Sequence, residues 1–180
     1  ITFLPTLENM GENAWDVSAL KNGAIMAWTI PNGDLQDLYI AGEGGVKLNR
    51  DCTELFSGYR NMVSIDFNGC VDASVVKSMD SMIEHCNSLR YADLSGLDTS
   101  RVETLRCLFY MCPNLESVNL SGLNTSRVTD MSLMFRECVS LKELDLSGFN
   151  TRRVTTMESM FYGCESLRSL DLSGFDTRRV

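Results

Sequence analysis

Features that would indicate catalysis, metal binding or a membrane span are scarce in this chain of 180 residues. It has one histidine, no Cys-x-x-Cys pair and no recurring group of serine, histidine and acid, which argues against a structural zinc site and a hydrolase triad. No apolar run approaches the roughly 18 residues that a membrane-spanning helix needs. Lysine and arginine total 16 against 24 acidic residues, and this net charge of -8 argues against a nucleic-acid partner. A binding or structural protein remains.

What the chain does contain is one short motif, repeated four times at a constant interval of 26 residues. The motif reads Leu-Ser-Gly-(Leu/Phe)-(Asp/Asn)-Thr, and its copies begin at Leu94, Leu120, Leu146 and Leu172. A fixed period of this length is typical of a solenoid, in which each copy forms one unit stacked on the next. Such a stack has a long repetitive surface, which suits binding better than a single convergent catalytic pocket.

Each repeat carries two hydrophobic patterns, which predict two kinds of secondary structure. The first, as in Leu141, Leu144 and Leu146, alternates in its second half like a strand with one buried face. The second recurs at offsets of three, six, seven and ten residues, which trace one face of a short α-helix. Its clearest copies are Val128, Met131, Met134, Phe135 and Cys138, and Val154, Met157, Met160, Phe161 and Cys164. The sequence therefore predicts an α/β solenoid, a leucine-rich-repeat-like right-handed stack of strand-turn-helix units with one parallel sheet.

The beginning of the chain contains no copy of the repeat, and it predicts a separate N-terminal cap over residues 1–45. Residues 24–30 and 35–40 flank a turn at 31–34, which is typical of a β-hairpin. The solenoid of 26-residue repeats is expected over residues 46–180, and its last copy stops in mid-repeat. The side chains of Leu170, Leu172 and Phe175 would then lie at an open edge, where we expect end-to-end self-association.

The cysteines recur mostly in one column of the repeat and are expected in the core. Cys86, Cys112, Cys138 and Cys164 occupy the inward face of the predicted helices, so we expect buried free thiols rather than disulfides or metal ligands. Cys107 would lie on another face of its helix, which makes it the best candidate for an exposed, oxidisable thiol. The sequence predicts no metal, no cofactor and no catalytic residue.

The strand positions that point away from the predicted core are the candidate contact surface. In a parallel sheet their side chains would form ladders with rungs about 4.8 Å apart. Stacked carboxylates repel each other, so either hydrogen bonds to flanking serines and water or a cationic partner must offset the repulsion. Tyr91 is the single aromatic residue of this surface and a candidate contact anchor. The candidate partner-binding residues are Asp66, Tyr91, Asp93, Ser117, Asn119, Glu143, Asp145, Ser169 and Asp171.

The repeat consensus is seen best in residues 141–166 and reads L-x-x-L-D-L-S-G-F-(D/N)-T-x-x-V-T-x-M-x-x-M-F-x-x-C-x-S. It resembles the 26-residue repeat of BspA-like bacterial leucine-rich-repeat surface proteins, and the resemblance covers about residues 52–180. It implies an extracellular protein of a bacterial cell surface, without catalytic activity, that binds a host or matrix protein or glycan in adhesion or host interaction. The alternative is a structural spacer that presents another module. No lipid-attachment cysteine or wall-anchor signal occurs within the chain.

Overall fold

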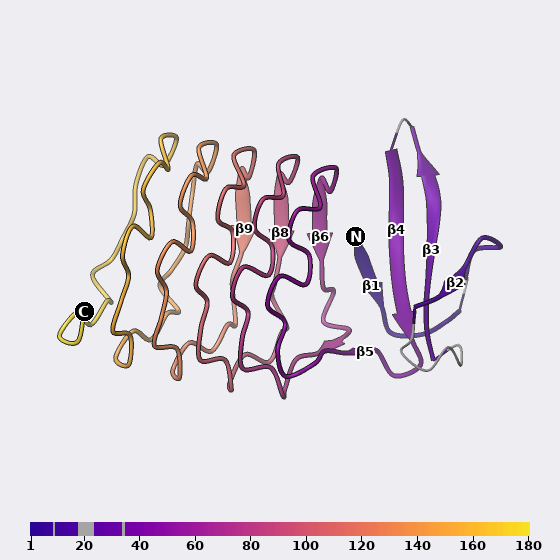
Figure 1. Cartoon of the computed structure of the whole chain (residues 1–180), viewed down its shortest axis with the longest axis horizontal. Coiled ribbons are helices and arrows are strands. Elements are labelled where there is room, and N and C mark those ends of the chain that lie inside the picture. Colours follow the sequence, from indigo (N-terminus) through magenta and orange to yellow (C-terminus); the bar gives the residue numbers. More distant parts are fainter. Residues whose placement is uncertain (9, 18–23, 34) are drawn as a thin grey trace.

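A computed structural model of the chain describes residues 1–8, 10–17, 24–33 and 35–180. Figure 1 shows thin coils stacked in a row, with a sheet that contains a hairpin at the N-terminal end. None of the described residues forms an α-helix. The strands are β1 (Thr2–Leu4), β2 (Trp15–Asp16), β3 (Ile25–Asn32), β4 (Leu35–Gly42), β5 (Val46–Lys47), β6 (Ser64–Asp66), β7 (Val71–Asp72), β8 (Tyr91–Asp93) and β9 (Ser117–Asn119).

One mixed sheet joins the N-terminal hairpin to the coils, with the strand order β2-β3-β4-β1-β6-β8-β9. The hairpin of β3 and β4 is antiparallel and confirms the predicted hairpin, but β3 includes Pro31 and Asn32, which the sequence had assigned to the turn. β1 is parallel to β4 on one side and to β6 on the other. The link between cap and coils is therefore made by residues 2–4, for which the sequence pattern indicated no role.

One long side of the coil stack, which we call the strand side, is a row of parallel strands. Ile65 pairs with Ala92, and Ala92 pairs with Val118. These register shifts of 27 and 26 residues match the repeat period, including the extra residue that precedes β7. Within residues 120–180 the row continues without further strand pairing.

The other long side of the stack, predicted to be helical, consists of tight turns. We call residues 78–86, 104–112, 130–138 and 156–164 the turn side. The amides of Leu105, Cys107 and Phe109 donate to carbonyl oxygens of the next coil at 2.9–3.0 Å, whereas the Leu108 amide donates to the carbonyl three residues earlier. At the start of the turn side, isolated parallel bridges also link successive coils. They pair Ser78 with Thr104, Thr104 with Asp130, and Asp130 with Thr156.

The predicted α/β solenoid of strand-turn-helix units with one parallel sheet is therefore wrong: the turn side contains no helices, the main sheet is mixed, and β5 and β7 form a second sheet of two strands. The lack of helices on the turn side has two physical reasons. Positive φ angles recur four residues apart, as at Leu133 (60°) and Glu137 (62°), and they turn the N–H groups from the helical direction toward the next coil. Neighbouring coils on the turn side are also joined by direct backbone hydrogen bonds, as at Leu105, Cys107 and Phe109, whereas packed helices would lie about 8–10 Å apart. Buried side chains recur every three to four residues in both structures, so the hydrophobic period alone could not separate them.

The core runs along the stack between the strand side and the turn side. The rings of Phe109, Phe135 and Phe161 stack in succession, with centroids 5.6 and 6.1 Å apart. The methionines of the repeat fill most of the remaining space, and Met131 and Met134 are fully buried. Because Phe135 contacts a ring on both sides, one continuous apolar column holds neighbouring coils together.

The cysteine thiols bind backbone groups of the preceding coil. The Cys112 thiol donates to the Ile83 carbonyl at 3.1 Å, and the Cys138 thiol donates to the Phe109 carbonyl at 3.2 Å. All seven cysteines are free, and for the four of the repeat column this was the prediction. The expectation that Cys107 is exposed is wrong, because only 4% of its surface is accessible. That expectation rested on a helix face, and the turn side has none.

A buried threonine joins successive coils at one corner of the stack. The Thr125 hydroxyl accepts a hydrogen bond from the Asn150 amide at 2.7 Å and donates to the Asn150 carbonyl at 3.2 Å. Thr99 and Thr151 make the same pair of bonds with their following coils. The hydroxyl thus takes the place of a backbone partner, which explains the constant Thr of the motif.

Candidate functional site

The nine candidate contact residues lie on the outer face of the strand side or on its continuation. Asp66 pairs with Asp93, and Asp93 pairs with Asn119, in neighbouring strands. Tyr91 pairs with Ser117 in the same ladder. The structure therefore brings these five residues together on β6, β8 and β9. The other four, Glu143, Asp145, Ser169 and Asp171, are exposed on the two coils that follow β9 and belong to no strand.

The acidic column has a local structural function in every coil. Asp93 Oδ1 accepts a hydrogen bond from the Ser95 amide at 2.8 Å, which forms an Asx turn at the end of the strand. The same turn recurs at Asp66, Asn119, Asp145 and Asp171, each bonded to the amide two residues later. The recurrence of Asp or Asn in this column is thus explained by the turn, which uses one side-chain oxygen.

Asp93 has more polar partners than the other acids of the column. Its Oδ2 accepts hydrogen bonds from the Tyr91 hydroxyl at 2.9 Å and from Asn119 Nδ2 at 3.0 Å. Partial burial alone would raise the pKa of Asp93, but hydrogen bonds from Ser95, Asn119 and Tyr91 outweigh burial and lower it. Burial and the bond to Asp93 raise the pKa of Tyr91. Asn119 therefore supplies a donor where another carboxylate would repel Asp93.

The acids of the last two coils are the most open charges of this surface. Hydrogen bonds from Ser147 lower the pKa of Asp145, and those from Ser173 lower the pKa of Asp171. Both carboxylates therefore stay ionised at neutral pH. Between the coils of Asn119 and Asp145 lies a groove of about 220 Å³, walled by the Ser-Gly turns of both coils. The outer face thus offers anionic charge and hydroxyl groups along its length.

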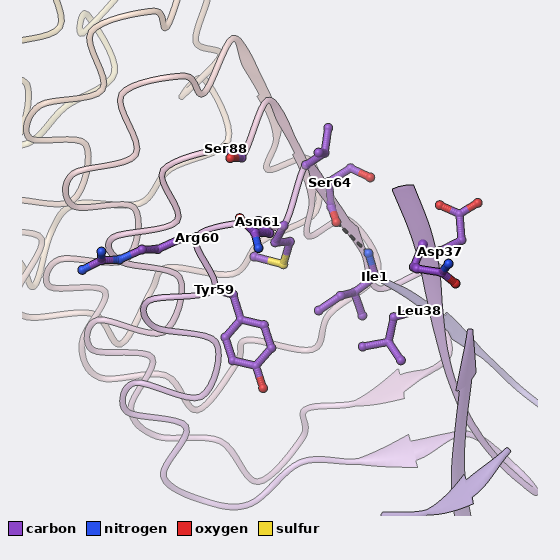
Figure 2. Close-up of a pocket in the computed structure, with 11 residues that line it drawn as sticks. Ile1, Asp37, Leu38, Tyr59, Arg60, Asn61, Ser64 and Ser88 are labelled. Atoms are coloured by element: carbon purple, nitrogen blue, oxygen red, sulfur yellow. Dashed lines mark hydrogen bonds between the residues drawn. The ribbon is translucent and has the colours of Figure 1, made fainter. Parts of the chain in front are cut away.

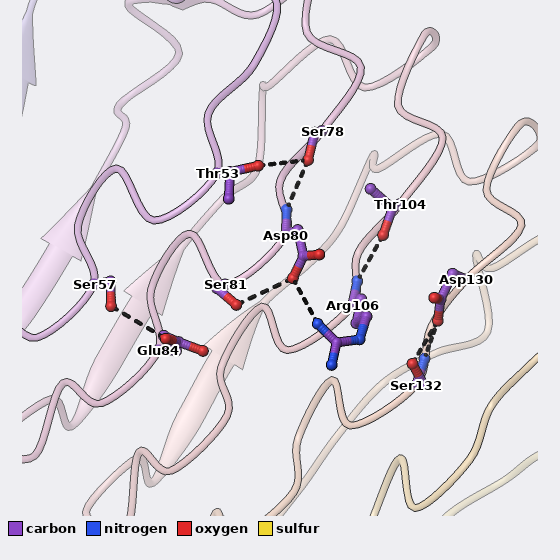
Figure 3. Close-up of polar contacts among 10 residues, drawn as sticks. All are labelled: Thr53, Ser57, Ser78, Asp80, Ser81, Glu84, Thr104, Arg106, Asp130 and Ser132. Carbon is purple, nitrogen blue, oxygen red and sulfur yellow. Dashed lines mark hydrogen bonds and ion pairs between the residues drawn. The ribbon is translucent and has the colours of Figure 1, made fainter.

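The turn side carries a separate polar row, which the sequence reasoning did not single out (Figure 3). Asp80 accepts a hydrogen bond from the Ser81 hydroxyl at 3.1 Å and forms an ion pair with Arg106 of the next coil at 3.6 Å. Asp130 accepts from the Ser132 amide at 2.8 Å. The sequence did contain an indication of this row, because Asp80 and Arg106 occupy the same column of the repeat and carry opposite charges. Their ion pair joins residues of neighbouring coils within the stack.

The described part of the chain contains no group of three His, Cys, Asp or Glu side chains placed to hold a metal ion. No helix among the same residues is long and apolar enough to cross a bilayer.

The fold and this surface define a repeat protein with an extended, anionic strand side, whose described residues contain no helix. Residues 72–180, more than half of the chain, match the family described as "Mycoplasma protein of unknown function, DUF285". The chain belongs to this family, and the match covers repeats but not the hairpin. No curated protein and no solved structure matches the chain. The resemblance to BspA-like repeats stays a prediction.

Proposed function

We propose that this protein is a non-enzymatic protein of a bacterial cell surface that binds a macromolecular partner through its strand side. The row of ionised carboxylates on successive coils carries the proposal, together with the exposed ring of Tyr91, of which 39% is accessible. The partner is a host or matrix protein or glycan, with cationic groups facing the acids. The resemblance to BspA-like repeats supports the extracellular location and a function in adhesion or host interaction.

Affinity at such a surface comes from several coils acting together. One exposed ion pair contributes about 0–1 kcal/mol, because solvent screens both charges. A partner that contacts Asp93, Asp145 and Asp171 at once would add these small terms and could bury the ring of Tyr91 beside them. Such binding weakens as salt rises, since the Debye length falls to about 3 Å at 1 M ionic strength.

A structural spacer is the second candidate function, and one observation favours it. Each acid of the column already accepts a turn hydrogen bond, so the charges have a structural explanation without a partner. Charges elsewhere are also paired between coils, as Glu116 is with Arg90 and with Lys142. A spacer would hold its neighbours apart and bind nothing.

Asparagine substitutions test the binding surface without breaking the turns. Asp93→Asn with Asp145→Asn removes two charges but keeps an oxygen for each Asx turn, as the natural Asn119 does. Lysine at these positions would also remove the turn acceptor. The wild-type chain is first screened against matrix proteins and glycans at low salt. We expect the double variant to bind the partner so found several-fold and at most about thirtyfold more weakly, since two exposed ion pairs together contribute no more than about 2 kcal/mol.

The matched control is Asp72→Asn with Asp98→Asn. These two acids form the same turns with Ser74 and Ser100, outside the acidic column of the strand side. The control should bind like the wild type. Equal binding by both double variants would remove the strand side from the proposal. A wild-type chain that binds nothing in the screen would favour the spacer.

End-to-end self-association is the other interaction that we propose. Leu172 on the last coil is 39% exposed, and Leu170 and Phe175 are only partly buried. A second copy could cover these side chains at the same edge. Light scattering should show a mass that grows with concentration, and Leu172→Lys should suppress that growth. A monomer over the whole concentration range would contradict this proposal.

A further inference from the structure

The corner of the stack that holds the buried threonines also carries a row of arginines, which the proposed function does not use. In each coil a valine amide closes a turn on the carbonyl three residues earlier, as Val128 does on Thr125 at 3.0 Å. The third position of this turn is an arginine in every copy of the motif, at Arg101, Arg127, Arg153 and Arg179. We call residues 98–103, 124–129, 150–155 and 176–180 the basic corner.

Backbone hydrogen bonds hold the arginines of neighbouring coils in line. The Thr129 amide donates to the Glu103 carbonyl at 2.9 Å, and the Thr155 amide donates to the Thr129 carbonyl at 2.8 Å. Backbones that are bonded directly in this way lie about 4.8 Å apart. The side chains of Arg127 and Arg153 are exposed, so they follow one another along the surface at about this interval.

The charge of the basic corner is opposite to that of the whole chain. Its side chains include six arginines and three carboxylates, a net charge of +3, whereas the chain carries -8. The excess is greatest in the two middle coils, because residues 124–129 and 150–155 hold three arginines and no acid. At 0.1 M salt, charges more than about 10 Å apart are largely screened, so the local charge of this corner governs an approaching anion.

The arginines of the two middle coils have no carboxylate of their own. Among the described residues, Lys77 and Arg106 each form an ion pair with an acid of a neighbouring coil. Arg127, Arg152 and Arg153 form none with any described residue. Their guanidinium groups are therefore free to bind an external anion through two N–H groups at once.

Asparagine replaces aspartate beside these arginines. Asp98 Oδ1 accepts a hydrogen bond from the amide two residues later at 3.0 Å, and Asn124 Oδ1 accepts in the same way at 3.0 Å. Asn150 repeats this turn at 3.2 Å. The turn needs only the oxygen, so it does not explain the amide group. Within the described residues Nδ2 of Asn124 and of Asn150 has no partner, and both can donate to a ligand.

We propose that the basic corner is a binding site for a sulfated glycan chain that lies along the stack. Such a linear polyanion meets at least one guanidinium group in each coil, and the asparagine amides donate to sulfate or sugar oxygens beside them. No residue of the basic corner is aromatic, so it offers no ring on which a nucleic-acid base could stack. The site is separate from the strand side and does not depend on the function proposed there.

Heparin fragments added to the full chain test the site, and the affinity is measured at several salt concentrations. Each neutralised anionic group releases about 0.7–0.9 of a counterion, so contacts with three arginines predict a slope of about -2 to -3 for log K against log salt. Arg127→Gln with Arg153→Gln should weaken binding several-fold at low salt and leave a slope of about -1. Desulfated heparin should not bind.

The matched control is Arg60→Gln with Arg168→Gln, which removes the same charge at exposed arginines outside the basic corner. Arg60 belongs to the segment before β6, beside a cavity of about 670 Å³ between that segment and β4 (Figure 2). The control should keep the wild-type slope. The strand-side variant Asp93→Asn with Asp145→Asn should bind heparin at least as tightly as the wild type, which separates this site from the strand side.

Four outcomes would contradict the proposal. Equal weakening by the two arginine pairs would overturn the location. Equal binding of desulfated and sulfated heparin would overturn the assignment to sulfate groups. Single-stranded DNA that binds as tightly as heparin would overturn the assignment to a glycan. A wild-type chain that binds no heparin at low salt would overturn the site itself.

Discussion

The strand side and the turn side of each coil share one register but satisfy their backbones differently. On the strand side, extended residues pair with the coils before and after, and small side chains such as Ala92 and Val118 point inward. On the turn side, every second amide reaches the next coil, and large rings such as Phe135 fill the core. A hydrophobic period therefore indicates which side chains are buried, but it does not indicate which carbonyl groups the backbone N–H groups bond.

The largest expected difference between the two sides is in core truncation. Phe135→Ala removes a fully buried ring from between two stacked neighbours, and we expect it to cost about 3–5 kcal/mol of unfolding free energy. Val118→Ala removes two methyl groups from a partly buried position and should cost about 1 kcal/mol. Urea unfolding measures both. Equal losses would mean that the two sides contribute alike to stability.

Two glycine variants should change the folding stability in opposite directions, by less than the core truncation does. They test whether the turn side consists of turns rather than helices. Glu137 has a φ of 62°, and the same column holds glycine at Gly58 and Gly163 in other coils. Glu137→Gly should therefore stabilise the chain by about 1 kcal/mol, because glycine adopts this backbone without a Cβ clash. Glu158→Gly, at an exposed turn-side position outside the positive-φ set, should destabilise it by about 1 kcal/mol.

Thermal unfolding of the two glycine variants and the wild type provides the measurement. In an α-helix both substitutions would lower the melting temperature, since glycine is unfavourable throughout a helix interior. A loss of stability in Glu137→Gly equal to that in Glu158→Gly would contradict the turn structure.

The sequence was sufficient for the features that a strict repeat determines. The period predicted stacked units, the hairpin followed from its turn residues, and the cysteine column predicted buried thiols, as at Cys112. The helix prediction failed because Met131, Met134 and Phe135 are buried at helical spacing in the turns as well. A positive φ leaves little trace in a column that holds His, Met, Glu and Gly in different coils.

Part of the candidate surface could also be predicted, since alternation in the strands places Asp66, Asp93 and Asn119 in one row. The donor function of the Asn119 amide depends on a 3.0 Å contact that only coordinates show. The insertion of β1 beside β6 could not be predicted, because Ile1 and Ser64 are 63 positions apart and share no repeat column. Nothing in local spacing indicates which distant segment inserts beside β6.

The hydrogen bonds of Thr125 and Cys138 have a consequence for how the molecule responds to force. Thr125 reaches forward to the following coil, and the Cys138 thiol reaches back to the preceding one. Because these bonds run between coils, an interior coil loses bonds to both neighbours when it opens, whereas a terminal coil loses bonds to only one. A pull along the stack should therefore peel coils off one at a time from a free end.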